Sequence, residues 1–200
     1  DCIPCAAGRY VATTGAVAAS DCIGCVAGKY VTTSGAAAAS SCTDCAAGLY
    51  GEVVGGSSST TACISCDAGE YTSSSGKTYC NTCQAGSITD KGSAAGAATC
   101  TTCEAGSYSA SSTDSDCAAC DAGSITNTGS STGASICTAC AVGKYSTAST
   151  ASACGGCMAG QYAASDGSAT CDACSASTYQ DAAGQGYCKV CLAGSRTDTG

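Results

Sequence analysis

The spacing of the cysteines constrains this chain more than any other feature. All 22 cysteines fall into eleven Cys-x-x-Cys pairs, from Cys2/Cys5 to Cys188/Cys191, and none is left over. The pairs begin at residues 2, 22, 42, 63, 80, 100, 117, 137, 154, 171 and 188, so their starts lie 17 residues apart in short repeats and 20 or 21 apart in long ones. We therefore interpret residues 1–200 as one continuous array of eleven repeats, and expect the array to continue beyond both ends. Repeat 1 begins at Cys2, and the others follow in order.

A second signature follows the second Cys of every pair. Ala stands two residues after it, with Val142 as the one substitute, and Gly stands three residues after it in ten of the eleven repeats, with Ser177 as the exception. We call this glycine the slot glycine. Its recurrence predicts a backbone position with positive φ or a close approach of another chain segment, because glycine alone has no Cβ.

A tyrosine marks the fifth position after the second Cys in eight repeats. Ile88, Ile125 and Arg196 take its place in the other three. Since it is the one large side chain of each repeat, we expect the ring to pack over a disulfide or over the backbone of the next repeat. These repeat-packing tyrosines are Tyr10, Tyr30, Tyr50, Tyr71, Tyr108, Tyr145, Tyr162 and Tyr179.

Large apolar side chains are too few for a conventional core. Leu, Ile, Val and Phe number 2, 6, 8 and 0 in 200 residues, whereas Cys numbers 22, a content typical of disulfide scaffolds. No helical periodicity survives the Gly and Ser breaks, and Ala36 to Ala39 are too few to nucleate a stable helix. One disulfide cannot offset the conformational entropy of a 17-residue unit, so the units must also stack. The predicted fold is a small disulfide-rich repeat, an elongated rod or solenoid of short β-strands and turns with little or no helix.

Three chemistries compete for the paired cysteines. Disulfide bonding is the main interpretation. The spacing also overlaps the zinc-ribbon pattern, but a four-cysteine zinc site uses two adjacent pairs and predicts an alternating unit, whereas this motif recurs once per pair. Redox catalysis of the thioredoxin type needs a Cys-x-x-Cys at a helix N-terminus, and no such helix is predicted here. A zinc-binding array stays a minor alternative.

The pattern Cys-x-x-Cys-x-Ala-Gly-x-Tyr, followed by about a dozen residues and the next Cys, resembles the ephrin-receptor-like or growth-factor-receptor-like cysteine-rich repeat. Arrays of protist surface coat proteins, such as ciliate immobilisation antigens, are similar. The resemblance spans the whole chain. It departs at one point, because the family commonly has Pro directly after the second Cys, and the single Pro of this chain is Pro4.

The simplest scheme that bonds every unit alike joins the second Cys of one pair to the first Cys of the next. This scheme agrees with the resemblance, and Cys2 and Cys191 then pair with repeats outside these residues. A bond within each Cys-x-x-Cys is the alternative, although such small rings are strained. The predicted disulfides are Cys5–Cys22, Cys25–Cys42, Cys45–Cys63, Cys66–Cys80, Cys83–Cys100, Cys103–Cys117, Cys120–Cys137, Cys140–Cys154, Cys157–Cys171 and Cys174–Cys188.

Charge and residue types limit the possible functions. The net charge is −8 with no basic cluster, which argues against a nucleic-acid partner, and no apolar run reaches the length of a membrane span. The chain has no His and offers no nucleophile–base pair, so we expect neither an enzyme nor a cofactor. Ser and Thr number 30 and 25 and concentrate between the cysteines, where they could carry O-linked glycans.

These observations lead to one main hypothesis. The chain is predicted to be a secreted structural protein of an extracellular fibril, cell-surface coat or stalk, with self-association as its expected partnership. The alternative is the ligand-binding ectodomain of a receptor or adhesion protein. Such ectodomains usually bind through aromatic and Arg residues, whereas this chain has no Trp or Phe and only two Arg.

Overall fold

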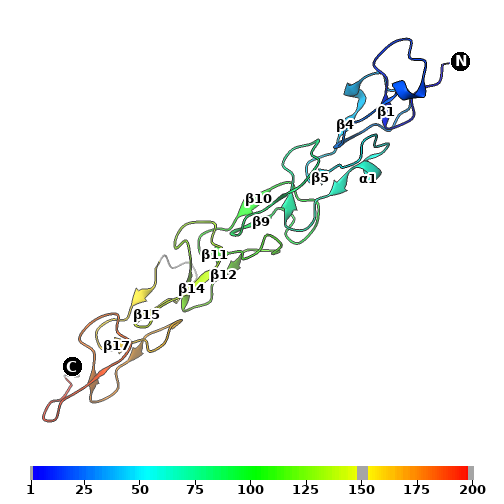
Figure 1. Cartoon of the computed structure of the whole chain (residues 1–200). Helices are drawn as coiled ribbons and strands as arrows, with labels where there is room; N and C mark the ends of the chain where they lie inside the picture. Colours follow the sequence, from blue (N-terminus) through cyan, green and yellow to red (C-terminus); the bar gives the residue numbers. More distant parts are fainter. Residues whose placement is uncertain (1, 148–152, 198–200) are drawn as a thin grey trace. The chain divides into compact units, whose positions relative to one another are not determined.

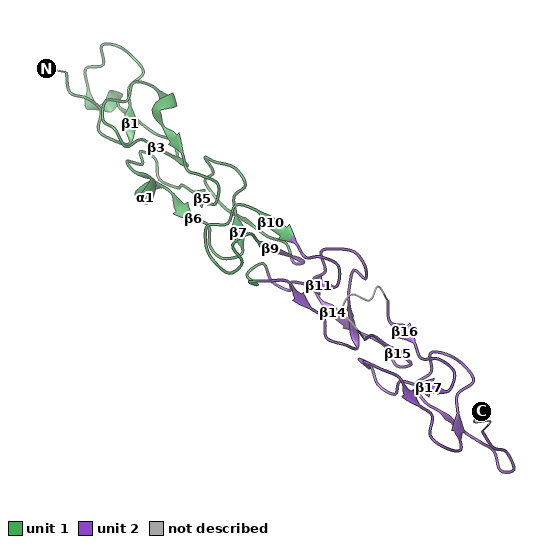
Figure 2. Cartoon of the chain, turned by 180° about the vertical axis from the view of Figure 1, so that it is seen from behind, with its two compact units in different colours: residues 1–84, 88–101, 112–115 green, residues 85–87, 102–111, 116–200 purple. Residues whose placement is uncertain are grey.

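The computed structural model describes residues 2–147 and 153–197. Its contacts divide the chain into two compact units (Figure 2). Unit 1 comprises residues 1–84, 88–101 and 112–115, and unit 2 comprises residues 85–87, 102–111 and 116–200. Both units are built from the same short hairpin, so the repeat rather than the unit is the natural element of description.

Twenty short strands form ten two-stranded sheets in the described residues, and the pairs other than β9 with β10 are shown as antiparallel by their registers (Figure 1). The first five pairs along the chain are β1 (Arg9–Tyr10) with β2 (Ile23–Gly24), β3 (Lys29–Tyr30) with β4 (Thr43–Asp44), β5 (Leu49–Tyr50) with β6 (Ile64–Ser65), β7 (Glu70–Tyr71) with β8 (Asn81–Thr82), and β9 (Ser87–Thr89) with β10 (Cys100–Thr102). In unit 2 they are β11 (Ser107–Tyr108) with β12 (Ala118–Ala119), β13 (Ser124–Thr126) with β14 (Cys137–Ala139), β15 (Lys144–Tyr145) with β16 (Gly155–Gly156), β17 (Gln161–Tyr162) with β18 (Asp172–Ala173), and β19 (Thr178–Tyr179) with β20 (Lys189–Val190).

Helix is confined to three short segments of the described residues. They are η1 (Ala19–Asp21), η2 (Ala39–Ser41) and α1 (Ser59–Ala62). The four alanines 36–39 do not form a helix of their own, because only Ala39 belongs to η2. The prediction of a small disulfide-rich repeat with short strands, turns and little helix is therefore confirmed.

Each hairpin is organised by the slot glycine. The two residues before it begin a turn in which, for example, the Arg9 N–H donates to the Ala6 carbonyl at 3.2 Å. Gly8 has φ of +88°, the value that the third residue of a type II turn requires. Every slot residue in the described chain has positive φ, including Ser177 at +68°. The first strand follows the turn, and the Gly8 carbonyl accepts the N–H of Cys25 at the end of the second strand, at 2.9 Å.

Three kinds of backbone hydrogen bond recur between one repeat and the next. In the first, the slot glycine N–H donates to the carbonyl of the residue after the tyrosine in the next repeat, as from Gly48 to Thr72 at 3.0 Å. In the second, the N–H of the residue after the tyrosine donates to a carbonyl of the following repeat, as from the Thr72 N–H to the Ala97 carbonyl at 3.2 Å. The third starts from the segment between the tyrosine position and the next Cys, which we call the tract. The N–H of Gly96 in this segment donates to the Cys66 carbonyl of the preceding repeat at 2.8 Å.

This second glycine recurs with positive φ and was not predicted from the sequence. We call it the tract glycine; its described examples are Gly15, Gly35, Gly55, Gly76, Gly96, Gly133, Gly167 and Gly184. It stands ten residues after the second Cys in most repeats and thirteen after it in repeats 5 and 7. The tracts are therefore not only surface loops. In seven described tracts the glycine N–H donates to the carbonyl of the second Cys of the preceding repeat, from Gly35 with Cys5 to Gly184 with Cys157.

The position of the tract glycine separates the long repeats into two types. In repeats 1 to 3 the extra residues follow it and form η1, η2 and α1. In repeats 5 and 7 they precede it and lengthen the hairpins to three residues in each strand, in β9, β10, β13 and β14. Insertions thus occur on either side of the tract glycine, where they leave its contacts unchanged.

Slot and tract glycines also meet across two repeats. A Cβ added to Gly28 would lie 2.6 Å from the Gly76 carbonyl oxygen; at Gly69, whose partner repeat has no tract glycine, it would lie 2.7 Å from Ser112 Oγ. Overlap with the tract glycine two repeats on is expected in the same way at five further slot glycines: Gly8, Gly48, Gly86, Gly123 and Gly143. Both sequence-based reasons for the slot glycine, positive φ and close approach, are confirmed.

Replacing Gly143 by Ala tests the close approach. Gly143 has φ of +80° and contacts Gly184, so strain and overlap together should lower the free energy of unfolding by about 2–5 kcal/mol. Gly160→Ala is the matched control: its φ is also +80°, but an added Cβ would meet nothing within 4 Å in the described chain. Gly160→Ala should therefore lower the free energy of unfolding by only ~1–2 kcal/mol, the cost of backbone strain alone. Urea unfolding without reductant compares the two, and equal losses would contradict a role for close approach.

Candidate functional site

The candidate site is the junction at which three successive repeats meet. At Gly55 of repeat 3, the N–H donates to the Cys25 carbonyl of repeat 2 at 2.7 Å, and the backbone lies against Gly8 of repeat 1. Gly184 is placed in the same way by Cys157 and Gly143. These contacts use backbone atoms and glycines, so the same junction recurs in repeats with different surrounding side chains.

Ten disulfides fix the cysteines that flank these junctions. They join the ten cysteine pairs given above, the second Cys of each pair to the first Cys of the next, with Cα–Cα distances of 5.5–5.9 Å. Each bond closes the same loop that the strand pair closes. The disulfide and the hairpin therefore constrain one segment together.

The two cysteines of a disulfide are not equally buried. The second Cys of a pair is buried in nine repeats, with Cys25, Cys45, Cys66, Cys140 and Cys157 fully inaccessible, whereas most of their partners are half-buried or exposed. Cys42 is the exception among the partners, at 8% exposure. The interior of each repeat is thus a cysteine sulfur surrounded by small residues and backbone.

The tyrosines of the fifth position lie at the side of this interior rather than inside it. Seven are half-buried, and Tyr179 is 40% exposed. Tyr10 packs against the cluster of Cys25, Val31, Ala36 and Cys42. The ring therefore covers the disulfide of the next repeat at this position.

The residue after the tyrosine is more deeply buried than the tyrosine. Val11 and Thr197 at this position are half-buried and Gly51 is buried, and in the other eight repeats, two of which have Ile in place of the tyrosine, the residue is at most 5% exposed: Val31, Thr72, Thr89, Ser109, Thr126, Ser146, Ala163 and Gln180. Sequence reasoning missed it because its residue types share neither size nor polarity. Alternation along the strand was the available signal, since neighbours in a strand point to opposite faces.

Buried polar side chains at this position bond to nearby backbone. Thr72 Oγ1 accepts from the Gly48 N–H at 2.9 Å, and Gln180 Nε2 donates to the Tyr187 carbonyl at 2.7 Å. No buried side-chain nitrogen or oxygen in the described residues lacks a partner. These groups stabilise the interior and are not available as catalytic groups.

The lengthened hairpins of repeats 5 and 7 carry a matching internal brace. Asp90 Oδ1 accepts the N–H groups of Ala98 and Thr99 at 3.0 and 3.2 Å, and Asn127 Oδ1 accepts that of Ser135 at 3.1 Å. The acidic and amide side chains at this position therefore hold loop backbone.

Two ion pairs occur among the described residues, Lys29–Asp44 at 2.8 Å and Lys189–Asp181 at 2.6 Å. The hydrogen bond from Lys189 lowers the pKa of Asp181, and the same bond raises the pKa of Lys189. Lys189 Nζ also lies 5.7 Å from the centroid of the Tyr179 ring. Because both partners are exposed to solvent, this pair is a surface feature of repeats 10 and 11.

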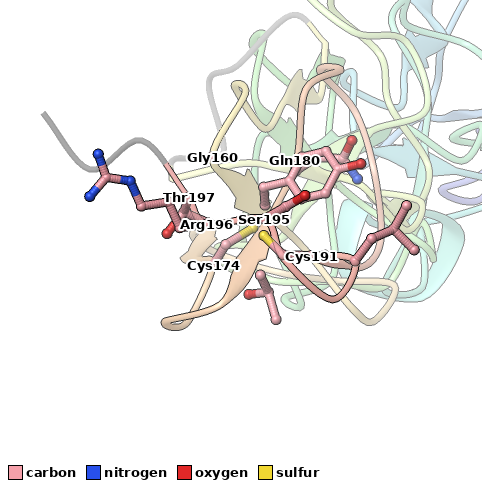
Figure 3. A pocket seen from close by; sticks show the side chains of 10 residues that line it. Gly160, Cys174, Gln180, Cys191, Ser195, Arg196 and Thr197 are labelled. Atoms are coloured by element: carbon pink, nitrogen blue, oxygen red, sulfur yellow. The ribbon is translucent and has the colours of Figure 1, made fainter.

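A hollow of about 600 Å³ lies beside repeats 9 to 11 (Figure 3). Its lining includes Gly160, Cys174, Gln180, Cys191 and Leu192. The described lining residues include no carboxylate, and the Gln180 amide is already bonded to backbone.

Cys2 and Cys191 have no disulfide partner in the described chain; Cys2 is exposed and Cys191 half-buried. Their pairing with further repeats stays a prediction. Residues 2–147 and 153–197 contain no group of three potential metal ligands, and the cysteines of the zinc alternative other than Cys2 and Cys191 are engaged in disulfides. No helix in the same residues has the length and apolar character to cross a membrane.

Fold and junction together define a small disulfide-rich repeat array. The family model described as tyrosine-protein kinase ephrin type A/B receptor-like matches residues 160–200 of the chain. This match confirms the resemblance to the ephrin-receptor-like cysteine-rich repeat in that segment. The comparison with curated proteins found no match.

Peptide mapping of the oxidised chain checks the connectivity. Proteolysis without reductant, followed by mass spectrometry, should recover Cys140 linked to Cys154 and Cys157 linked to Cys171, because each bond closes a hairpin. Recovery of Cys154 linked to Cys157 would support the alternative of bonds within each pair.

Removing one disulfide measures its contribution. The double substitution Cys120→Ser and Cys137→Ser opens a loop of 17-residue separation and should lower the free energy of unfolding by about 3 kcal/mol. Cys2→Ser is the control, since Cys2 is exposed and unbonded here, and it should leave stability unchanged. Chemical unfolding of the three proteins makes the comparison, and a loss below about 1 kcal/mol would show that the hairpin is held without its disulfide.

Proposed function

We propose that this chain is a non-enzymatic structural segment of an extracellular coat, stalk or fibril. The three-repeat junction is the observation that carries the proposal. Because the junction consists of backbone hydrogen bonds and glycine contacts, it repeats along the chain without depending on a particular surface side chain. Such a design suits a protein whose task is to extend and to resist unfolding.

The disulfides support an extracellular or cell-surface location. Ten bonds in 200 residues are maintained in oxidising compartments and are rare in the cytosol. O-linked glycans on the exposed Ser and Thr of the tracts, such as Ser57, Thr60 and Thr61, belong to the same proposal. Self-association and an elongated shape complete it, with no cofactor and no nucleic-acid partner.

A receptor-type ectodomain is the second candidate. It is favoured by the match of residues 160–200 to the ephrin-receptor-like family. In this case a protein ligand would bind through exposed side chains. The most accessible large ones outside the terminal repeats include Val54, Tyr79 and Met158, at 67%, 63% and 69% exposure.

Two sets of variants separate the candidates. One set changes exposed side chains (Val54→Ser, Tyr79→Ser and Met158→Ser), and the other changes the junction (Gly48→Ala and Gly86→Ala). For a structural array we expect the first set to leave coat or fibril formation unchanged and the second to reduce it strongly, because the junction packs each repeat on the repeat two places away. The measurements are negative-stain microscopy of the native assembly and surface labelling of cells that express each variant.

The opposite pattern would favour the receptor. Loss of binding to the cell surface or to a soluble ligand in the first set, with assembly absent throughout, would contradict the structural proposal. Small-angle X-ray scattering of the purified chain tests the elongated shape independently. Native protein that is intracellular with 22 free thiols would contradict both candidates.

A further inference from the structure

One position of the consensus departs from its residue type in a single repeat. The residue two places after the second Cys is Ala in ten repeats and Val142 in repeat 8. Val142 is 48% exposed, so its larger side chain is not explained by burial in a core. The contacts of the side chain must therefore explain why this position is Val.

A second exception lies two repeats further along the chain. The residue two places after the tract glycine carries a side chain in every other repeat that has this position, for example Ser57, Thr78 and Ala169. In repeat 10 it is Gly186. The one valine and the one glycine thus occur in repeats whose slot and tract glycines, Gly143 and Gly184, already meet.

The two exceptions are in contact. A Cβ added to Gly186 would run into Val142 Cγ1, and the next nearest atom outside Val142 is the Ala163 carbonyl oxygen at 3.4 Å. Gly186 does not have positive φ, so its backbone accepts any residue and space alone requires glycine there. A third residue, Asp166 of repeat 9, holds the Val142 backbone in place, because its Oδ1 accepts the Val142 N–H at 2.8 Å.

We propose that Val142 and Gly186 form a matched knob and hole that determines which tract lies over repeat 8. A valine side chain has few χ1 rotamers, and Asp166 holds its backbone N–H, so its methyl groups have few alternative positions. A tract with Ser, Thr or Ala at this position is therefore disfavoured, which is specificity by steric rejection. The partner that this surface fits is a repeat of the same type with Gly at that place. The proposal rests on the junction geometry and stands whether the array serves as a coat or as a receptor.

A double-mutant cycle tests the pair. Gly186→Ala should increase hydrogen exchange in residues 140–146 and lower the thermal midpoint, because the new methyl group and Val142 compete for one space. Val142→Ala should change both readouts little, and the double variant should regain the protection that Gly186→Ala loses. A Gly186→Ala protein with unchanged exchange, or a double variant no better than Gly186→Ala, would overturn the proposal.

The same pair can be moved to the preceding junction as a control. Ala122 and Ala169 occupy the corresponding positions in repeats 7 and 9, where Gly123 meets Gly167. Ala122→Val alone should increase exchange in residues 120–126, and adding Ala169→Gly should restore it. Failure of the glycine to restore protection would show that the effect at Val142 is not one of matched shape.

Discussion

The close approach of backbones at the glycine junction is the constraint on which the rest of this structure depends. At six described slot glycines, the tract two repeats further on lies against the glycine and hydrogen-bonds to the second cysteine of the repeat in between; they are Gly8, Gly28, Gly48, Gly86, Gly123 and Gly143. Such proximity leaves no space for side chains, so glycines are required and large apolar residues are not. The chain can therefore fold with 16 Leu, Ile and Val residues among 200. Disulfides then fix each loop in the conformation that the junction needs.

Coupling over two repeats gives the array a different energetic pattern from a simple stack. In a solenoid with nearest-neighbour contacts, stability is the sum of repeat and interface contributions. Here Gly8, Gly28 and Gly48 each depend on a tract two repeats away, so three consecutive repeats form the smallest set with a complete junction. The ion pairs, by contrast, are exposed and contribute little. At one junction, the proposed match of Val142 with Gly186 adds a side-chain contact to this backbone pattern.

Much of the fold was predictable because the signals repeat eleven times. Positive φ at the slot glycine, short strands, turns and scarce helix follow from Gly recurrence and from the absence of apolar periodicity. The tract glycine was missed because its distance from the second Cys changes from ten to thirteen residues in repeats 5 and 7. The buried residue after the tyrosine was missed because Val31, Thr72 and Gln180 share no chemical type. Both are defined by neighbours in space, which a search along one repeat does not detect.

The sequence by itself determined the repeat length, the hairpin turn at the slot glycine and the dependence on cysteine in place of an apolar core. These properties are local or compositional, because a turn is set by a few neighbouring residues and a core requires enough apolar area. Only the tertiary structure decided which glycines meet, which cysteine of each disulfide is buried, and that the tyrosine lies beside the interior while its neighbour fills it. These properties depend on contacts between repeats that are far apart along the chain, and spacing alone does not say which repeat packs on which.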